Sequence, residues 1–271
     1  MLNKLLKHEF TATGRFMWVI YAAMALLSVG ANLSMRYMSG GHNKILNAIS
    51  VLVLVAWGLS LVIGVVMTIV LLVKRFHQNL LTDEGYLMFT LPGTVHQLVL
   101  SKLIAAVVWL MVTILVVILC VFIAVLENDL LQDVMDVIRY MFQEMTARTA
   151  LNGTAVIVEC LAALFVGCAC SCLQFYSAMS LGYGFNSHKA LWSVVLYFLM
   201  QFALQVIATV LMIALGNLAP VQTTVAGMVG SMTAMQTWHL GILSTIALEL
   251  VVSAVFYIIT VLNLQKRLNL S

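Results

Sequence analysis

Residues 45–73 read ILNAISVLVLVAWGLSLVIGVVMTIVLLV, a run without Lys, Arg, Asp or Glu that is bracketed by Lys44 and Lys74. A helix needs about 20 consecutive apolar residues to cross the hydrocarbon core of a bilayer. A barrel strand would instead alternate polar and apolar residues over about ten positions, and this run does not alternate. The stretch therefore predicts a membrane-spanning α-helix, whose backbone groups pair within the segment.

The same apolar character recurs in five other stretches of the chain. They are residues 16–35, 103–126, 155–178, 190–218 and 240–264. Hydrophobic residues make up 63% of the chain and charged residues only 8%, against about 25% in a soluble domain. Lipid rather than water must cover such a surface. The sequence predicts an all-α membrane protein with one transmembrane domain over residues 1–271, a bundle of six transmembrane helices.

The distribution of Lys and Arg predicts the orientation of the chain. With the N-terminus inside, the inner segments carry most of the basic residues, as the positive-inside rule requires. These inner residues are Lys4, Lys7, Arg15, Lys74, Arg75, Lys102, Lys189, Lys266 and Arg267. The outer segments carry only Arg36, Lys44, Arg139 and Arg148. We therefore expect a multi-pass protein of the cell membrane with both termini in the cytoplasm. Because Glu9 precedes the first run and the run is long, we expect a retained span rather than a cleaved signal peptide.

Three segments outside the spans have patterns of their own. Residues 2–10 are apolar on one helical face and polar or basic on the other, which predicts an N-terminal interfacial helix stopped by Gly14. Residues 127–148 combine helical apolar spacing with early acidic and late basic residues, which predicts an outer amphipathic helix. Residues 217–239 are uncharged and rich in Gly, Thr, Ser and Met, as in a re-entrant segment. The alternatives are a plain basic flank for the first and a solvated connector for the second.

The inner connection between the second and third spans is the most distinctive segment. Residues 74–92 read KRFHQNLLTDEGYLMFTLP. A helix continuing from the span is expected to end near Asp83 and Glu84, where Gly85 allows the chain to turn. A short apolar stretch follows, and Pro92 ends it. The pattern predicts a short helix within a compact cytoplasmic projection.

Two stretches of the chain resemble a known family. The run DEGYLMFTLP at residues 83–92, followed by QLVLSK at 97–102, resembles type 2 ABC exporter permeases common in Clostridia-like bacteria, as does LLKHEF at 5–10 with TGRF at 13–16. The resemblance implies a cytoplasmic coupling helix that docks on a separate ATPase subunit, an N-terminal elbow helix and a re-entrant segment before the last span. The residues it assigns to coupling are Arg75, Phe76, Asp83, Glu84, Gly85, Tyr86 and Pro92.

The resemblance also implies partners that the chain itself lacks. No G-x-x-x-x-G-K-[ST] phosphate loop occurs in the sequence, so we expect ATP and Mg to be bound by an ABC ATPase subunit and no cofactor in this chain. A second permease half, identical or related, would complete a homodimer or heterodimer in the lipid bilayer; no nucleic acid is expected. A transporter driven by an ion gradient, a membrane-embedded enzyme and a regulatory membrane protein without cargo remain as alternatives.

Glu159 and Glu249 are acidic residues within predicted spans. A charged side chain at the centre of a bilayer costs roughly 2.5–3.5 kcal/mol on insertion scales, so we expect a use for each, on a substrate path or at the contact between permease halves. The alternative is a carboxyl group paired with a nearby Thr, Asn or Gln. Cys168, Cys170 and Cys172 have poor spacing for one metal ion on a helix and are predicted to be small packing residues. No catalytic residue and no metal site are predicted.

Overall fold

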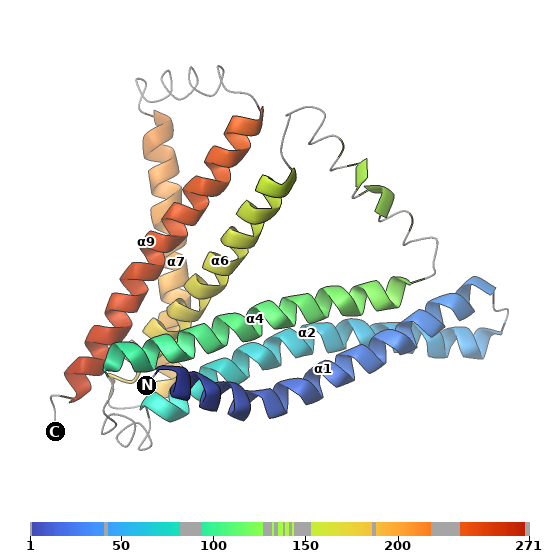
Figure 1. Cartoon of the computed structure of the whole chain (residues 1–271), viewed down its shortest axis with the longest axis horizontal. Coiled ribbons are helices and arrows are strands. Elements are labelled where there is room, and N and C mark those ends of the chain that lie inside the picture. Colours follow the sequence, from blue (N-terminus) through green and yellow to red (C-terminus); the bar gives the residue numbers. More distant parts are fainter. Residues whose placement is uncertain are drawn as a thin grey trace. The chain divides into compact units, whose positions relative to one another are not determined.

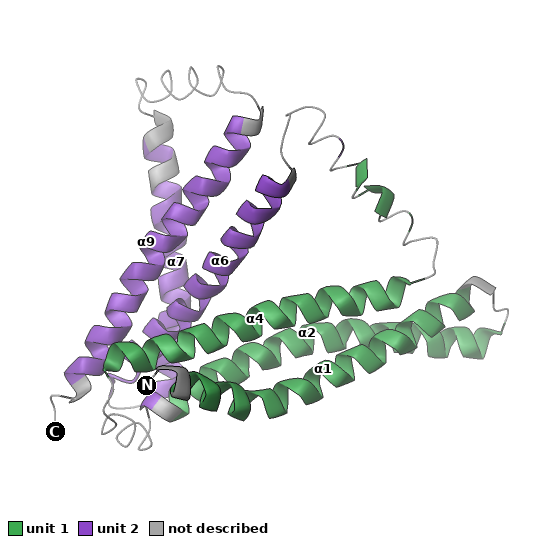
Figure 2. Cartoon of the chain, in the orientation of Figure 1, with its two compact units in different colours: residues 1–79, 91–140 green, residues 80–90, 141–271 purple. Residues whose placement is uncertain are grey.

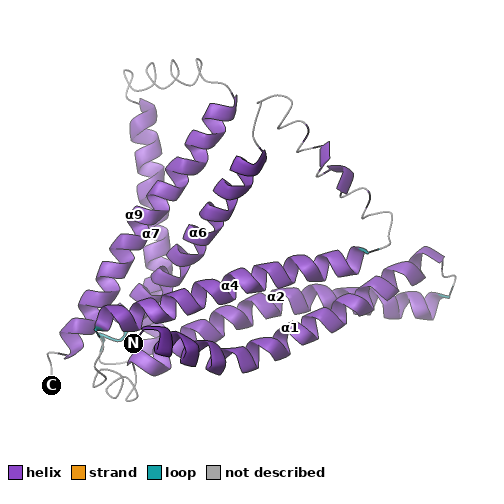
Figure 3. Cartoon of the chain, in the orientation of Figure 1, coloured by secondary structure: helices purple, strands orange, loops and turns teal. Residues whose placement is uncertain are grey.

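The computed structural model describes residues 2–40, 43–81, 94–126, 132, 135–137, 139–140, 143, 153–185, 188–217 and 234–268. Within these residues every regular element is a helix and none is a strand (Figure 3). The long helices are α1 (Leu2–Gly40), α2 (Lys44–Leu81), α4 (Val95–Val125), α6 (Gly153–Gly182), α7 (Lys189–Asn217) and α9 (Ala234–Leu268) (Figure 1).

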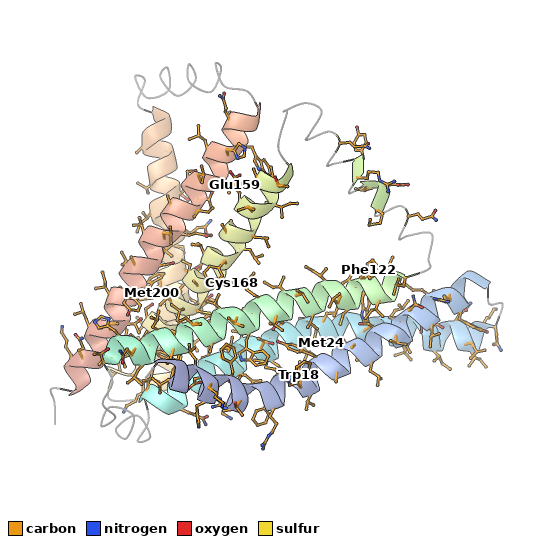
Figure 4. The ribbon with its side chains drawn as sticks, viewed as in Figure 1. Trp18, Met24, Phe122, Glu159, Cys168 and Met200 are labelled. Atoms are coloured by element: carbon orange, nitrogen blue, oxygen red, sulfur yellow. The ribbon has the colours of Figure 1, made fainter. Side chains whose placement is uncertain are left out.

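Each of these six helices carries a segment long and apolar enough to cross a membrane. The segments overlap the six predicted spans, so the expectation of an all-helical, multi-pass membrane protein is confirmed. Large apolar side chains remain exposed along the helices: Leu26 is 74% exposed, and Trp18 (Figure 4) and Phe202 are each 71% exposed. Lipid tails are the solvent that such a surface requires.

The chain forms two compact units (Figure 2). Unit 1 comprises Met1–Asn79 and Leu91–Tyr140 and holds α1, α4 and most of α2. Unit 2 comprises Leu80–Thr90 and Met141–Ser271 and holds α6, α7 and α9. In unit 1 the most extensive pairing is that of α1 with α4, and in unit 2 α6 packs against both α7 and α9.

Polar side chains join the three helices of unit 1 to one another. The hydroxyl groups of Tyr21 on α1 and Thr113 on α4 lie 2.7 Å apart, and Thr113 in turn donates to Thr68 of α2 at 3.3 Å. The indole of Trp57 on α2 donates to Ser28 of α1 at 3.0 Å. Because few other hydrogen-bond partners exist at membrane depth, such contacts favour one packing of the three helices.

The C-terminal end of α4 is capped from another helix. The amide of Asn32 on α1 donates to the carbonyl oxygens of Ala124 at 3.1 Å and Leu126 at 2.7 Å. The last four carbonyl groups of a helix have no partner within the helix, so this amide satisfies two acceptors that the helix leaves open. At the other end of α4, the hydroxyl of Thr94 accepts a hydrogen bond from the backbone N–H of Gln97 and caps the first turn.

Unit 2 is held by a close helix crossing and by aromatic stacking. A Cβ atom added at Gly182, the last residue of α6, would lie 2.6 Å from the backbone N of Ser193 on α7. The rings of Phe175 on α6 and Tyr197 on α7 stack with centroids 4.4 Å apart. The α6–α7 contact therefore depends on a small residue at one position and on ring packing at another.

The predicted boundary between an interfacial helix and the first span is wrong. Helix α1 runs without interruption from Leu2 to Gly40 and passes through Gly14. Gly14 is buried, and a Cβ atom there would lie 3.6 Å from the ring of Trp109 on α4. A glycine inside a helix costs only about 1 kcal/mol relative to alanine, and the packing of α1 on α4 outweighs that cost.

Other predicted segments lie outside the described residues. These are the predicted coupling helix within residues 82–93, most of the outer segment 127–148, and residues 218–233 of the predicted re-entrant segment.

Candidate functional site

The structure describes four of the nine residues predicted to act in coupling or transport. Arg75 and Phe76 lie on the last turns of α2, Glu159 lies near the start of α6 (Figure 4), and Glu249 lies in the middle of α9. Asp83, Glu84, Gly85, Tyr86 and Pro92 lie outside the described residues. The site is therefore built from the helix ends that flank the predicted coupling segment and from the acidic residues of unit 2.

A buried ion pair joins the first turns of α1 and α4. The ammonium Nζ of Lys102 lies 2.6 Å from Oε1 of Glu9, and the two side chains are only 3% and 7% exposed. Removing one partner of such a pair leaves an uncompensated buried charge, which is strongly destabilising. Neither residue is therefore expected to be replaceable on its own. The sequence alone does not indicate this pairing, because Glu9 and Lys102 are far apart in the chain.

The same face of α1 continues as a stripe of buried residues toward the other end of the helix. Thr13, Met17, Tyr21, Met24 and Ser28 follow Glu9 at intervals of three or four residues, and all are buried. This spacing places them on one side of a helix. The stripe meets both α2 and α4, so α1 links the two helices that flank residues 82–93.

Arg75 faces α1. Its side chain, together with His8, Thr11, Ala12, Arg15 and Phe16 of α1, lines an open pocket of about 360 Å³ in unit 1. Arg75 is also close enough to Lys102 for its charge to act on that ammonium group. Phe76, the next residue, is fully buried. Arg75 and Phe76 are the two described residues among those predicted to act in coupling. Near the end of α2, Arg75 lines the pocket and Phe76 is buried.

Glu159 of α6 pairs with His239 of α9. Oε1 of the carboxyl group lies 2.5 Å from Nδ1 of the imidazole, and the side chains are 18% and 21% exposed. The sequence predicted a Thr, Asn or Gln partner as the alternative to a transport role, so the pairing with His239 was not foreseen. One feature could have indicated this pair. Glu159 and His239 lie a similar number of positions after the starts of α6 and α9, and these two helices are predicted to cross the membrane in the same direction.

Glu249 lies against α6 at a glycine. A Cβ atom added at Gly167 would lie 3.5 Å from Oε1 of Glu249. The charge of Glu249 also acts on the neighbouring thiols of Cys168 and Cys170. Oε2 of Glu249 is buried and has no hydrogen-bond partner among the described residues. An unpartnered carboxylate oxygen at this depth is costly. Among the described residues Oε2 of Glu159 is also buried without a hydrogen-bond partner, although its Oε1 pairs with His239.

The two acidic residues do not form one cluster. Glu249 follows His239 by ten positions on α9, which corresponds to about 15 Å along a helix. In the part of the chain that the structure describes, no group of three or more His, Cys, Asp or Glu residues could hold a metal ion. The described cysteines are free, including Cys168 and Cys172.

Comparisons of the chain with known protein families, with curated proteins and with solved structures find no match.

Proposed function

We propose that the chain is the permease half of a type 2 ABC exporter in the cell membrane. It would move an unidentified substrate with energy from ATP hydrolysis by a separate ABC ATPase subunit, and it would pair with an identical or related second half. The six apolar helices of spanning length and the resemblance of residues 83–92 and 5–16 to such permeases support the proposal. The absence of a phosphate-binding loop from the sequence explains why a separate ATPase is needed.

The observation that carries this proposal is that the helices before and after the predicted coupling segment are both bonded to other helices of unit 1. Before the segment, α2 bonds through Thr68 to Thr113 of α4. After it, α4 is tied to α1 by the pair of Lys102 with Glu9. A coupling mechanism needs a rigid element that transmits movement from the contact to the span. A force applied at residues 82–93 would be passed to α2 and α4, and through their contacts to α1 as well.

Glu249 is our candidate for the substrate path or for the contact between permease halves. Its Oε2, like that of Glu159, is buried without a partner among the described residues and needs a ligand, a water molecule or a second chain. Glu159 is the weaker candidate, because its Oε1 is already paired with His239. In this proposal Glu159 positions α6 against α9.

An ion-gradient-driven transporter is the second candidate function, favoured by one observation. The Glu159–His239 pair combines two titratable groups within the apolar part of unit 2, and such groups can carry protons in transporters. Vesicles containing the purified chain without an ATPase would decide between the two. Transport driven by a pH gradient alone would favour this candidate and contradict the exporter.

The proposal predicts that an ABC ATPase is encoded beside the gene for this chain, and coupling is tested with that ATPase. Co-purification with that ATPase and stimulation of its ATP hydrolysis are expected. The double substitution Asp83→Ala/Glu84→Ala should leave membrane insertion intact and abolish the stimulation, because it removes two charges from the docking contact. Asp133→Ala/Asp136→Ala in the predicted outer segment removes the same charge and should leave the stimulation unchanged.

Two results would contradict the coupling proposal. Full stimulation by the Asp83→Ala/Glu84→Ala variant would remove the coupling role of residues 83 and 84. Failure of the unaltered chain to bind or stimulate the ATPase would remove the exporter assignment itself.

The role of Glu249 is tested separately from coupling. Glu249→Gln keeps the shape of the side chain and removes its charge, and we expect transport by the complex to fall at least about tenfold, the effect of one lost charged contact worth about 1.4 kcal/mol. The thermal unfolding temperature should change little, because Oε2 has no partner to lose among the described residues. Unaltered transport by this variant would place Glu249 outside the path.

A further inference from the structure

The open pocket between the start of α1 and the end of α2 carries three basic side chains. Its lining residues are His8, Thr11, Ala12, Arg15 and Phe16 of α1 and Arg75 of α2. His8, Thr11, Ala12 and Arg15 have the spacing i, i+3, i+4 and i+7, which places them on one face of a helix. Two helices therefore present arginine side chains to a single volume of about 360 Å³.

The chemistry of the pocket selects an anion. Among the described residues that line it, none is acidic, and the nearby carboxyl group of Glu9 is buried against Lys102. Neither Arg15 nor Arg75 has an ion-pair partner among the described residues. The hydroxyl of Thr11 already donates to the carbonyl oxygen of Lys7 at 2.8 Å, so the guanidinium groups are the main donors.

The positions of the two arginines define the depth of the pocket in the membrane. Arg15 directly precedes the apolar run 16–35, and Arg75 follows the apolar run 45–73 after one lysine. Phe16 stands at the same level on α1 and is 58% exposed. Basic and aromatic residues at the ends of apolar runs lie at the level of the lipid headgroups. The pocket therefore lies where the phosphate groups of phospholipids are found.

We propose that this pocket is a binding site for the phosphate group of an anionic phospholipid, held between Arg15 of α1 and Arg75 of α2 with His8 beside them. A guanidinium group binds phosphate oxygens through two parallel N–H donors. Basic pockets between transmembrane helices are a recurring form of lipid headgroup site. Phe16 would lie along the acyl chains. The proposal stands whether or not the chain is an exporter, because it requires neither an ATPase nor a cargo.

The proposed lipid would link α1 to α2 at the end of unit 1. Two side-chain contacts of α2 with α1 lie farther along the helices, at Trp57 with Ser28 and at Thr68 with Met17. A bound phosphate would add a bridge at Arg75, directly before the segment of residues 82–93. Binding to the folded chain alone raises its stability as ligand concentration rises above the dissociation constant.

The test uses the purified full chain in bilayer nanodiscs of phosphatidylcholine with or without phosphatidylglycerol. Bound lipid is counted by native mass spectrometry, and the thermal unfolding temperature is measured in each bilayer. Retained phosphatidylglycerol and a higher unfolding temperature in its presence are expected. Arg15→Gln/Arg75→Gln should weaken the preference for phosphatidylglycerol roughly 30-fold, since each basic residue near an anionic lipid surface contributes about 1 kcal/mol.

A matched control removes the same charge from the other ends of the same two helices. Arg36→Gln/Lys44→Gln alters α1 and α2 away from the pocket and should keep the preference. Arg15→Lys/Arg75→Lys keeps the charge but not the paired N–H donors, so it should lose part of the preference for phosphatidylglycerol. This variant also tests the proposal if the Gln variant does not fold. A third arm adds inorganic phosphate to phosphatidylcholine nanodiscs and should give no rise in the unfolding temperature.

Three results would overturn the proposal. The first is an unchanged lipid preference in the Arg15→Gln/Arg75→Gln variant, or in the Lys variant when the Gln variant does not fold. The second is an equal loss in the Arg36→Gln/Lys44→Gln control, which would indicate a general charge effect. The third is full stabilisation by inorganic phosphate, which would assign the pocket to a soluble anion instead of a lipid.

Discussion

At the scale of single residues, the pair of Glu9 with Lys102 is a buried and closely spaced ion pair of unit 1. Both side chains are buried, and their charged atoms lie 2.6 Å apart. Burial of either charge alone is costly, whereas a pair with good geometry compensates much of the desolvation. The sequence suggested only that each residue belongs to the inner side of the chain, because a partner 93 positions away is brought near by helix packing alone.

Lys102→Met should lower the free energy of unfolding by about 3 kcal/mol, since it leaves the carboxylate of Glu9 buried without its main counter-charge. The double substitution Glu9→Gln/Lys102→Met removes both charges and should recover most of that loss. Denaturation in mixed detergent micelles measures the single variants Lys102→Met and Glu9→Gln and the double variant. A single variant as stable as the unaltered chain, or a double variant whose loss equals the sum of the two single losses, would show that the pair is not coupled.

At the scale of helices, apolar runs predicted the existence of each span but predicted less well where helices begin and end. The run 45–73 lies within α2, and the run 240–264 lies within α9. Gly14 was expected to stop a helix, but α1 passes through it because Trp109 of α4 packs against this face. Helix ends depend on contacts between helices, which the local pattern of one segment does not contain.

The crossing of α6 with α7 gives a prediction at the same scale. Gly182→Ala should destabilise the chain by about 1–3 kcal/mol, the usual cost of overpacking, because the added Cβ would lie 2.6 Å from backbone atoms of Ser193. Gly241→Ala on α9 is the matched control, since no atom lies within 4 Å of its added Cβ. The control should be neutral or stabilising through better helix propensity. Equal thermal unfolding temperatures for the two variants would contradict the close crossing.

The candidate site was predicted less completely than the spans. Glu159 and Glu249 stood out from the sequence because acidic residues are rare within apolar runs. The sequence did not reveal their different surroundings. Oε1 of Glu159 is paired with His239, whereas Glu249 lies against Gly167. The basic pocket was missed for a similar reason, since Arg15 and Arg75 lie 60 positions apart on two consecutive helices and meet only through packing.

At the scale of the whole molecule, the account depends on an even number of membrane crossings. If each of the six helices of spanning length crosses the membrane once, the two termini lie on the same side of the membrane. The excess of Lys and Arg in the segments assigned to the inner side predicts that this side is the cytoplasm. Residues 82–93 would then face the compartment in which an ATPase and its ATP are found, as the proposed function requires.

Cysteine labelling tests this topology most directly. In a chain whose five native cysteines are replaced by alanine or serine, Glu84→Cys should react with a membrane-impermeant maleimide only after the cells are opened. Asp133→Cys, in the segment predicted outside, should react in intact cells. Labelling of Glu84→Cys from outside intact cells would contradict the orientation of the chain and the proposed contact with a cytoplasmic ATPase.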